Sequence, residues 1–64
     1  MSQKVTCTMV VARDTKGSIV YNEIDAQGRD YTIANGAPVG SMYIRKSAFG
    51  GRIPPKITVT IAEG

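Results

Sequence analysis

The chain has 64 residues and carries eight Lys and Arg against five Asp and Glu, with no His, so its formal net charge is +3. A chain of this length forms one small domain, residues 1–64, and buries only about 60% of the surface that the unfolded chain exposes. One cysteine, Cys7, excludes an internal disulfide, and without histidine the usual zinc sites cannot form, so we expect self-association into a homodimer or higher homo-oligomer to supplement the core.

The amino-acid composition favours strands over helices. The chain has no leucine but contains seven Ile, six Val and six Thr. Such β-branched side chains lose rotamer freedom in a helix and fit the pleated surface of a sheet. The composition therefore predicts an all-β protein of about five short antiparallel strands.

The first predicted strand covers residues 4–13, with the sequence KVTCTMVVAR. Its alternation places Val5, Cys7, Met9 and Val11 on one face, and Val10 breaks this pattern. We expect either a β-bulge at Val10 or an outer face that is also covered.

A D-x-x-G pattern follows this strand from Asp14 to Gly17 and occurs again from Asp25 to Gly28. In each copy the Asp is expected to accept backbone hydrogen bonds, and the Gly to supply the positive φ of a type I turn with a G1 bulge. These two turns flank the second predicted strand, residues 18–24.

Three further strands are predicted over residues 30–34, 40–46 and 56–62. The dipeptide Asn35-Gly36 is a strong turn signal, and Ser47 to Phe49 is expected to form one helical turn that Gly50 ends. We expect an antiparallel meander curled into a small, partly open barrel of SH3-like or OB-like size. An open five-stranded sheet that dimerises face to face is the alternative.

Positive charge is concentrated in the second half of the chain. Residues 31–62 contain four bases and no acid, whereas bases and acids cancel over residues 1–30. If the last two strands pair, their outer faces bring Tyr43 and Arg45 beside Lys56. The pattern predicts a surface for single-stranded nucleic acid, in which bases stack on rings and Lys and Arg neutralise phosphates. The candidate nucleic-acid-binding residues are Tyr43, Arg45, Lys46, Phe49, Arg52 and Lys56.

These features also have purely structural explanations. Lys and Arg on an edge strand protect a sheet from edge-to-edge aggregation, and an aromatic residue such as Phe49 can plug the open end of a small barrel. The alternative function is therefore a protein-interaction or assembly module that pairs an edge strand with a partner.

No enzyme activity is expected. General acid–base catalysis would have to proceed without histidine, and neither the P-loop nor the dinucleotide fingerprint occurs. The position of Cys7 in mid-strand, on the face of Val5 and Met9, is typical of an inert core thiol. No catalytic residue, metal site or cofactor is predicted.

The sequence also predicts a soluble, cytoplasmic protein without a membrane partner. The first residues lack the apolar segment of a signal peptide, and the longest apolar run, residues 9–12, is far too short to span a bilayer. A single cysteine agrees with a reducing compartment.

Overall fold

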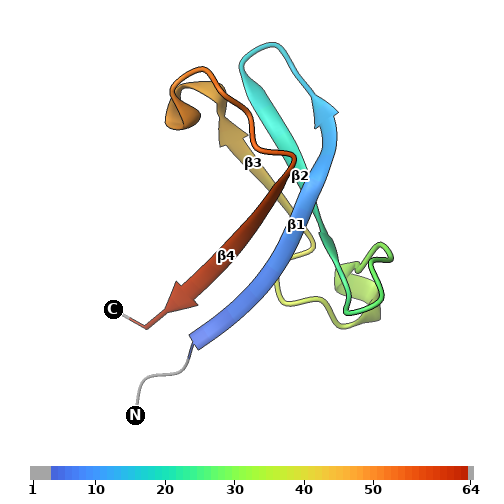
Figure 1. Ribbon diagram of the computed structural model, residues 1–64. Helices are drawn as coiled ribbons and strands as arrows, with labels where there is room; N and C mark the ends of the chain where they lie inside the picture. Colours follow the sequence, from blue (N-terminus) through green and yellow to red (C-terminus); the bar gives the residue numbers. More distant parts are fainter. Residues whose placement is uncertain (1–3, 64) are drawn as a thin grey trace.

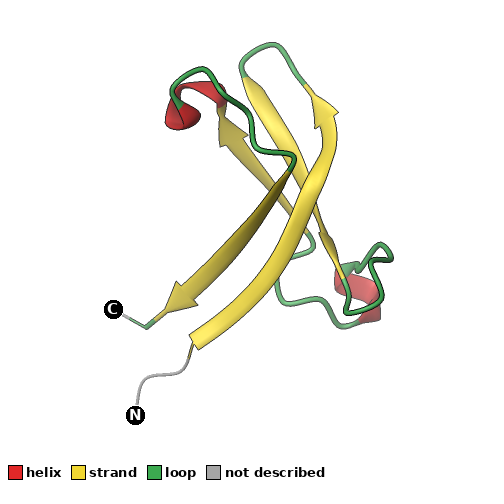
Figure 2. Cartoon of the chain, viewed as in Figure 1, coloured by secondary structure: helices red, strands yellow, loops and turns green. Residues whose placement is uncertain are grey.

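The computed structural model describes residues 4–63 as one curled antiparallel sheet (Figure 1). The strands are β1 (Lys4–Asp14), β2 (Ser18–Ile24), β3 (Ser41–Arg45) and β4 (Lys56–Ala62). Two short 3-10 turns, η1 (Ile33–Asn35) and η2 (Lys46–Phe49), lie in the connections between strands (Figure 2). The predicted all-β class is confirmed, with four strands in a half-barrel instead of about five.

The strand order is β3-β2-β1-β4. The first three strands form the expected meander, but β4 returns across the sheet to pair with β1, so β3 and β4 are the two edges. The expected pairing of the last two strands is therefore wrong. The register gives the physical reason. Val59 lies opposite Cys7 and Ile57 opposite Met9, so the apolar side chains of β4 pack beside the buried residues of β1.

The predicted strand over residues 30–34 is also wrong. Asp30 makes one isolated bridge with Ile24, and the chain then turns through η1. The side chain of Ile33 is 64% exposed, so this segment has no inward face that would keep it extended against the sheet. The predicted turn at Asn35-Gly36 is present, because Gly36 ends η1 with a φ of 96°.

The second D-x-x-G turn forms as expected. Asp25 Oδ1 accepts hydrogen bonds from the backbone N–H groups of Gln27 and Arg29, at 2.9 and 3.0 Å. Gly28 closes the turn with a φ of 81°, a backbone conformation that glycine adopts without steric cost.

The first D-x-x-G turn forms differently. Gly17 is absent from the glycines with positive φ in the described chain, so the expected G1 bulge is wrong at this position. Thr15 closes the turn instead, since its Oγ1 accepts from the N–H of Ser18 at 3.1 Å and donates to the carbonyl of Ser18 at 2.8 Å. The carboxylate of Asp14 is thereby left for another partner, Lys46.

A bulge in β1 lies two residues beyond the expected position. Val10 pairs regularly with Asn22, and the register shifts between Val11 and Arg13. One extra residue on a strand reverses the direction of the side chains that follow it. Arg13 consequently faces the side of the sheet opposite to Val11.

The core lies on the inner face of the half-barrel, the face that carries Cys7, Met9, Ile19 and Tyr21. All four side chains are buried, and partly buried residues surround them: Val39, Met42, Ile44, Phe49, Ile53, Ile57 and Val59. The predicted helical turn is present as η2, which ends at Gly50 with a φ of 66°. We call the opposite side of the sheet the outer face.

Candidate nucleic-acid interface

A row of three side chains crosses the outer face near one end of the sheet. Tyr43 of β3 lies opposite Val20 of β2, which in turn lies opposite Arg13 of β1. Arg13 Nη2 donates a hydrogen bond to the Tyr43 hydroxyl at 3.2 Å. Tyr43 is 65% exposed, whereas Val20 between its two neighbours is 5% exposed. The row therefore presents an aromatic ring to solvent, with a guanidinium group hydrogen-bonded to its hydroxyl.

An open hollow lies beside this row. It is lined by Ala12, Arg13, Val20, Asn22, Ser41 and Tyr43. Asn22 and Ser41 are hydrogen-bonded to each other, because Ser41 Oγ donates to Asn22 Oδ1 at 2.9 Å. The hollow thus combines one ring and one cation with two polar side chains that are hydrogen-bonded to each other.

Arg45 belongs to the same part of the outer face. It lies opposite Ser18, two residues along β3 from Tyr43, and both side chains are exposed. Residues two apart on a strand point to the same side of the sheet. Tyr43 and Arg45 therefore share the outer face, as the sequence predicts.

Lys56 is on the outer face but is not a neighbour of Tyr43. It lies opposite Val10 at the start of β4, and two strands separate it from β3. With strands about 4.8 Å apart, β4 lies roughly 14 Å across the sheet from β3, and the row of Lys56 meets β3 at Ser41, two residues before Tyr43. The expected compact patch of Tyr43, Arg45 and Lys56 does not form, and Arg13 occupies the position beside the ring.

The remaining candidates have different surroundings. Lys46 Nζ lies 2.6 Å from Asp14 Oδ1, so its charge is largely balanced. The half-buried Phe49 packs against the core, with its ring edge-on to Tyr21 at a centroid distance of 6.0 Å. This ring is therefore on the inner side of the molecule, away from Tyr43. Arg52 is exposed in the loop that follows η2.

The two ends of the sheet differ in charge. At the end where β1 and β3 finish and β2 and β4 begin, one acid, Asp14, accompanies six bases: Arg13, Lys16, Arg45, Lys46, Arg52 and Lys56. At the opposite end lie two bases and four acids, which are Lys4, Arg29, Glu23, Asp25, Asp30 and Glu63. Their sums, +5 and −2, account for the net charge of +3. The ring of Tyr43 faces solvent in the positive half.

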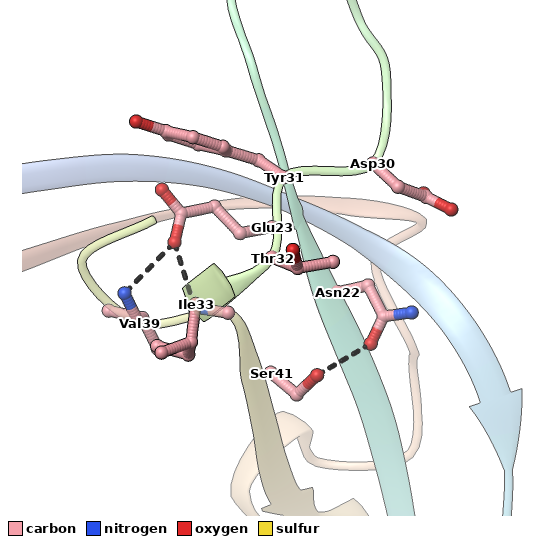
Figure 3. A pocket seen from close by; sticks show the side chains of 9 residues that line it. Asn22, Glu23, Asp30, Tyr31, Thr32, Ile33, Val39 and Ser41 are labelled. Carbon is pink, nitrogen blue, oxygen red and sulfur yellow. Dashed lines mark hydrogen bonds between the residues drawn. The ribbon is translucent and has the colours of Figure 1, made fainter. Parts of the chain in front are cut away.

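The second hollow, at the acidic end, is built around a buried carboxylate. Glu23 is 2% exposed, and its Oε1 accepts hydrogen bonds from the N–H groups of Val39 and Gly40, both at 3.0 Å (Figure 3). The backbone N–H of Glu23 donates to the Gly40 carbonyl at 2.7 Å, and its own carbonyl accepts from Tyr31 at 2.9 Å. Glu23 therefore holds two segments of the β2–β3 connection, at Tyr31 and at Val39 to Gly40, against β2 by hydrogen bonds. This structural role accounts for the buried carboxylate in the hollow.

The thiol of the buried Cys7 has low reactivity. Desolvation by burial raises the pKa of the Cys7 thiol, and the nearby charge of Glu23 raises it further. Burial likewise raises the pKa of Tyr21. A thiol held in its protonated form is a poor nucleophile and metal ligand, which agrees with the predicted role of Cys7 in the core.

Within residues 4–63, no cluster of three or more His, Cys, Asp or Glu side chains is arranged to hold a metal ion. Over the same residues, no helix has both the length and the apolar character needed to cross a bilayer. Comparison of the chain with known protein families, with curated proteins and with solved structures found no match.

The sequence patterns did not predict the roles of two residues, Arg13 beside Tyr43 and the buried Glu23. Arg13 was counted only in the charge balance, because its side-chain direction depends on a bulge that alternation alone misplaces. Glu23 was counted there too, although its spacing from Ile19 and Tyr21 places it on the buried face of β2. The period-two pattern of β2 was the signal that could have identified it.

Proposed function

We propose that this protein binds single-stranded nucleic acid, with little sequence preference, through the outer face around Tyr43. The observation that carries the proposal is the exposed ring of Tyr43, hydrogen-bonded at its hydroxyl by Arg13 and flanked by Arg45 at the basic end of the sheet. Solvent-exposed rings on a curved sheet give unpaired bases a stacking surface, and each stack contributes about 1–3 kcal/mol.

The surrounding charges suit a phosphate backbone. Arg13 lies across β2 from the ring, Arg45 lies two residues along β3 from it, and Lys56 lies on the same face on the far edge strand, β4. Arg52 extends the positive surface into the loop after η2. A strand that stacks one base on Tyr43 would therefore meet a cation whether its backbone runs across the sheet, past Arg13, or along β3, past Arg45.

The same geometry supports low sequence preference. Base discrimination requires hydrogen-bond donors and acceptors aimed at base edges, and the two polar uncharged side chains that line the hollow, Asn22 and Ser41, are bonded to each other. Stacking on a ring accepts every base, because each base has a π-face. Binding is therefore expected to depend on strandedness and salt more than on sequence.

Fluorescence anisotropy with a labelled single-stranded oligonucleotide tests the proposal. With three or four phosphate contacts, log affinity should fall against log salt with a slope of about −2 to −3. Raising salt from about 50 to about 200 mM then weakens binding roughly 20- to 60-fold. Absence of binding at the lower salt, with tens of micromolar protein, would end the proposal.

Paired variants separate stacking from charge. Tyr43→Ala should weaken binding by about 5- to 150-fold, whereas Tyr43→Phe retains the ring and should retain most of the affinity. Arg45→Glu should abolish binding at physiological salt. Arg29→Glu makes the same charge change at the opposite end of the sheet, where Arg29 is exposed, and should have a much smaller effect. Equal losses of affinity in the two Arg variants would show that binding depends on net charge alone. That result would contradict a site at Tyr43.

A further inference from the structure

The edge strand β4 lacks the features that normally protect an exposed sheet edge. β3, the other edge, has five residues and ends in Arg45, with Lys46 directly after it. β4 has seven residues, about 23 Å of strand, and carries no charge after Lys56. Natural sheets shorten, charge or cover their edges, because a long uncharged edge is a template for pairing with another chain. An edge with the character of β4 is expected to have a partner.

The backbone of β4 presents free hydrogen-bonding groups along this edge. The N–H of Val11 donates to the carbonyl of Pro55 at 3.1 Å, and antiparallel ladders alternate from one residue to the next. The backbone groups of Thr58 and Thr60 therefore point away from β1. Among residues 4–63, no hydrogen bond outside the β1–β4 ladder uses these groups.

On the inner face, apolar side chains of the β1–β4 pair are incompletely buried. Val5 of β1 lies opposite Ile61 of β4, and these side chains are 38% and 47% exposed. Ile57 and Val59 on the same face are only partly buried. Free backbone groups and an exposed apolar row thus occur on the same strand, where a strand of a second sheet would pair with the backbone groups and place its own apolar side chains beside the row.

We propose that two copies of this chain pair β4 with β4 in an antiparallel arrangement, around a two-fold axis perpendicular to the sheet. Such an axis places inner-face residues opposite inner-face residues. In the register centred on Val59, Ile57 lies opposite the partner's Ile61, and Thr58 lies opposite the partner's Thr60. Apolar side chains meet apolar ones, and hydroxyls meet hydroxyls, so the edge is complementary to itself.

Charge favours a second copy of the chain as the occupant. The pairing places Lys56 opposite the partner's Ala62, next to the partner's Glu63, and keeps the two copies of Lys56 at opposite ends of the joined strands. Because the strands are antiparallel, the end of one copy with a charge sum of +5 lies beside the end of the other with a sum of −2. The two outer faces remain exposed, so this interface does not depend on the proposed nucleic-acid binding.

Light scattering, with hydrogen exchange, tests the interface. The wild-type chain should have twice the monomer mass of 6.8 kDa, and the amide hydrogens of Thr58 and Thr60 should be protected. Thr58→Pro removes one outward N–H, which an edge strand tolerates, and should give a monomer. Thr58→Ala keeps that N–H and should remain a dimer. A wild-type monomer, or an oligomer that Thr58→Pro leaves intact in a folded protein, would overturn the proposal.

A charge-based pair of variants keeps the test decisive if the proline variant does not fold. Thr58 and Thr60 are exposed, so Thr58→Lys with Thr60→Lys should preserve the monomer fold while placing like charges opposite each other in the dimer. The matching variant with Glu at both positions should also be monomeric. Mixing the two variants should give a heterodimer. A mixture that stays monomeric would contradict pairing of β4 between two copies, and so would a β4 edge that binds only an unrelated protein.

Discussion

Replacement of Glu23 tests how the loop before β3 is held. Glu23→Ala removes the acceptor of two backbone N–H groups, those of Val39 and Gly40, each 3.0 Å from Oε1. Gly40 is buried and Val39 is partly buried, so neither donor is fully open to water. A buried donor left without a partner costs about 1–3 kcal/mol, which gives a loss of about 2–6 kcal/mol for the pair.

This loss is large for so small a domain. At about 0.05–0.15 kcal/mol per residue, a chain of 64 residues has a free energy of unfolding of about 3–10 kcal/mol. Each kcal/mol corresponds to about 4–8 °C in Tm at this size. Glu23→Ala should therefore lower Tm by at least about 8 °C and could unfold the protein. Glu23→Gln keeps an oxygen that accepts both hydrogen bonds, so we expect a smaller loss.

Thermal unfolding followed by circular dichroism measures the effect, with Asp30→Ala as the control. Asp30 is an exposed acid in the same hollow, and its removal should change the free energy of unfolding by less than about 0.5 kcal/mol. Hydrogen exchange should show faster exchange of the Val39 and Gly40 amides in Glu23→Gln. A Glu23→Ala protein as stable as Asp30→Ala would refute the role assigned to this carboxylate.

Three further perturbations have defined outcomes. Tyr21→Phe removes the 2.8 Å hydrogen bond to the Pro54 carbonyl and should lower the free energy of unfolding in urea by about 0.5–1.5 kcal/mol. Gly40→Ala, at a φ of 83° with a heavy atom 2.9 Å from the new Cβ, should lower Tm far more than Gly17→Ala, which has open space; equal Tm values would contradict this. Because burial raises the pKa of the Cys7 thiol above its ordinary 9.0, the unfolded chain loses this proton first, so the free energy of unfolding should fall as pH rises above about 9. Cys7→Ala should reduce that fall in urea titrations.

The strands themselves could be predicted from the sequence because their signals are local. Alternation of β-branched residues located four of the strands, and Asp25 with Gly28 identified a turn that the structure contains. The direction of Tyr43 and Arg45 followed from the same period of two. These features depend on residues a few positions apart, so the chain itself specifies them.

The pairing of the strands could not be predicted in this way. The choice of β1 over β3 as the partner of β4 depends on contacts between residues such as Cys7 and Val59, far apart in the sequence. The side-chain direction of Arg13 depends on a bulge whose position the pattern misplaced. The candidate interface changed accordingly: Arg13 entered it, Phe49 moved to the core, and Lys56 moved across the sheet.

Mapping of the binding surface by NMR is the most direct test of the central claim. Amide shifts of the isotope-labelled protein would be followed as a short single-stranded oligonucleotide is added at low salt. We expect the largest changes at Arg13, Tyr43 and Arg45, with little change in the turn from Asp25 to Gly28. Changes confined to that turn, or none at saturating oligonucleotide, would contradict the proposed site.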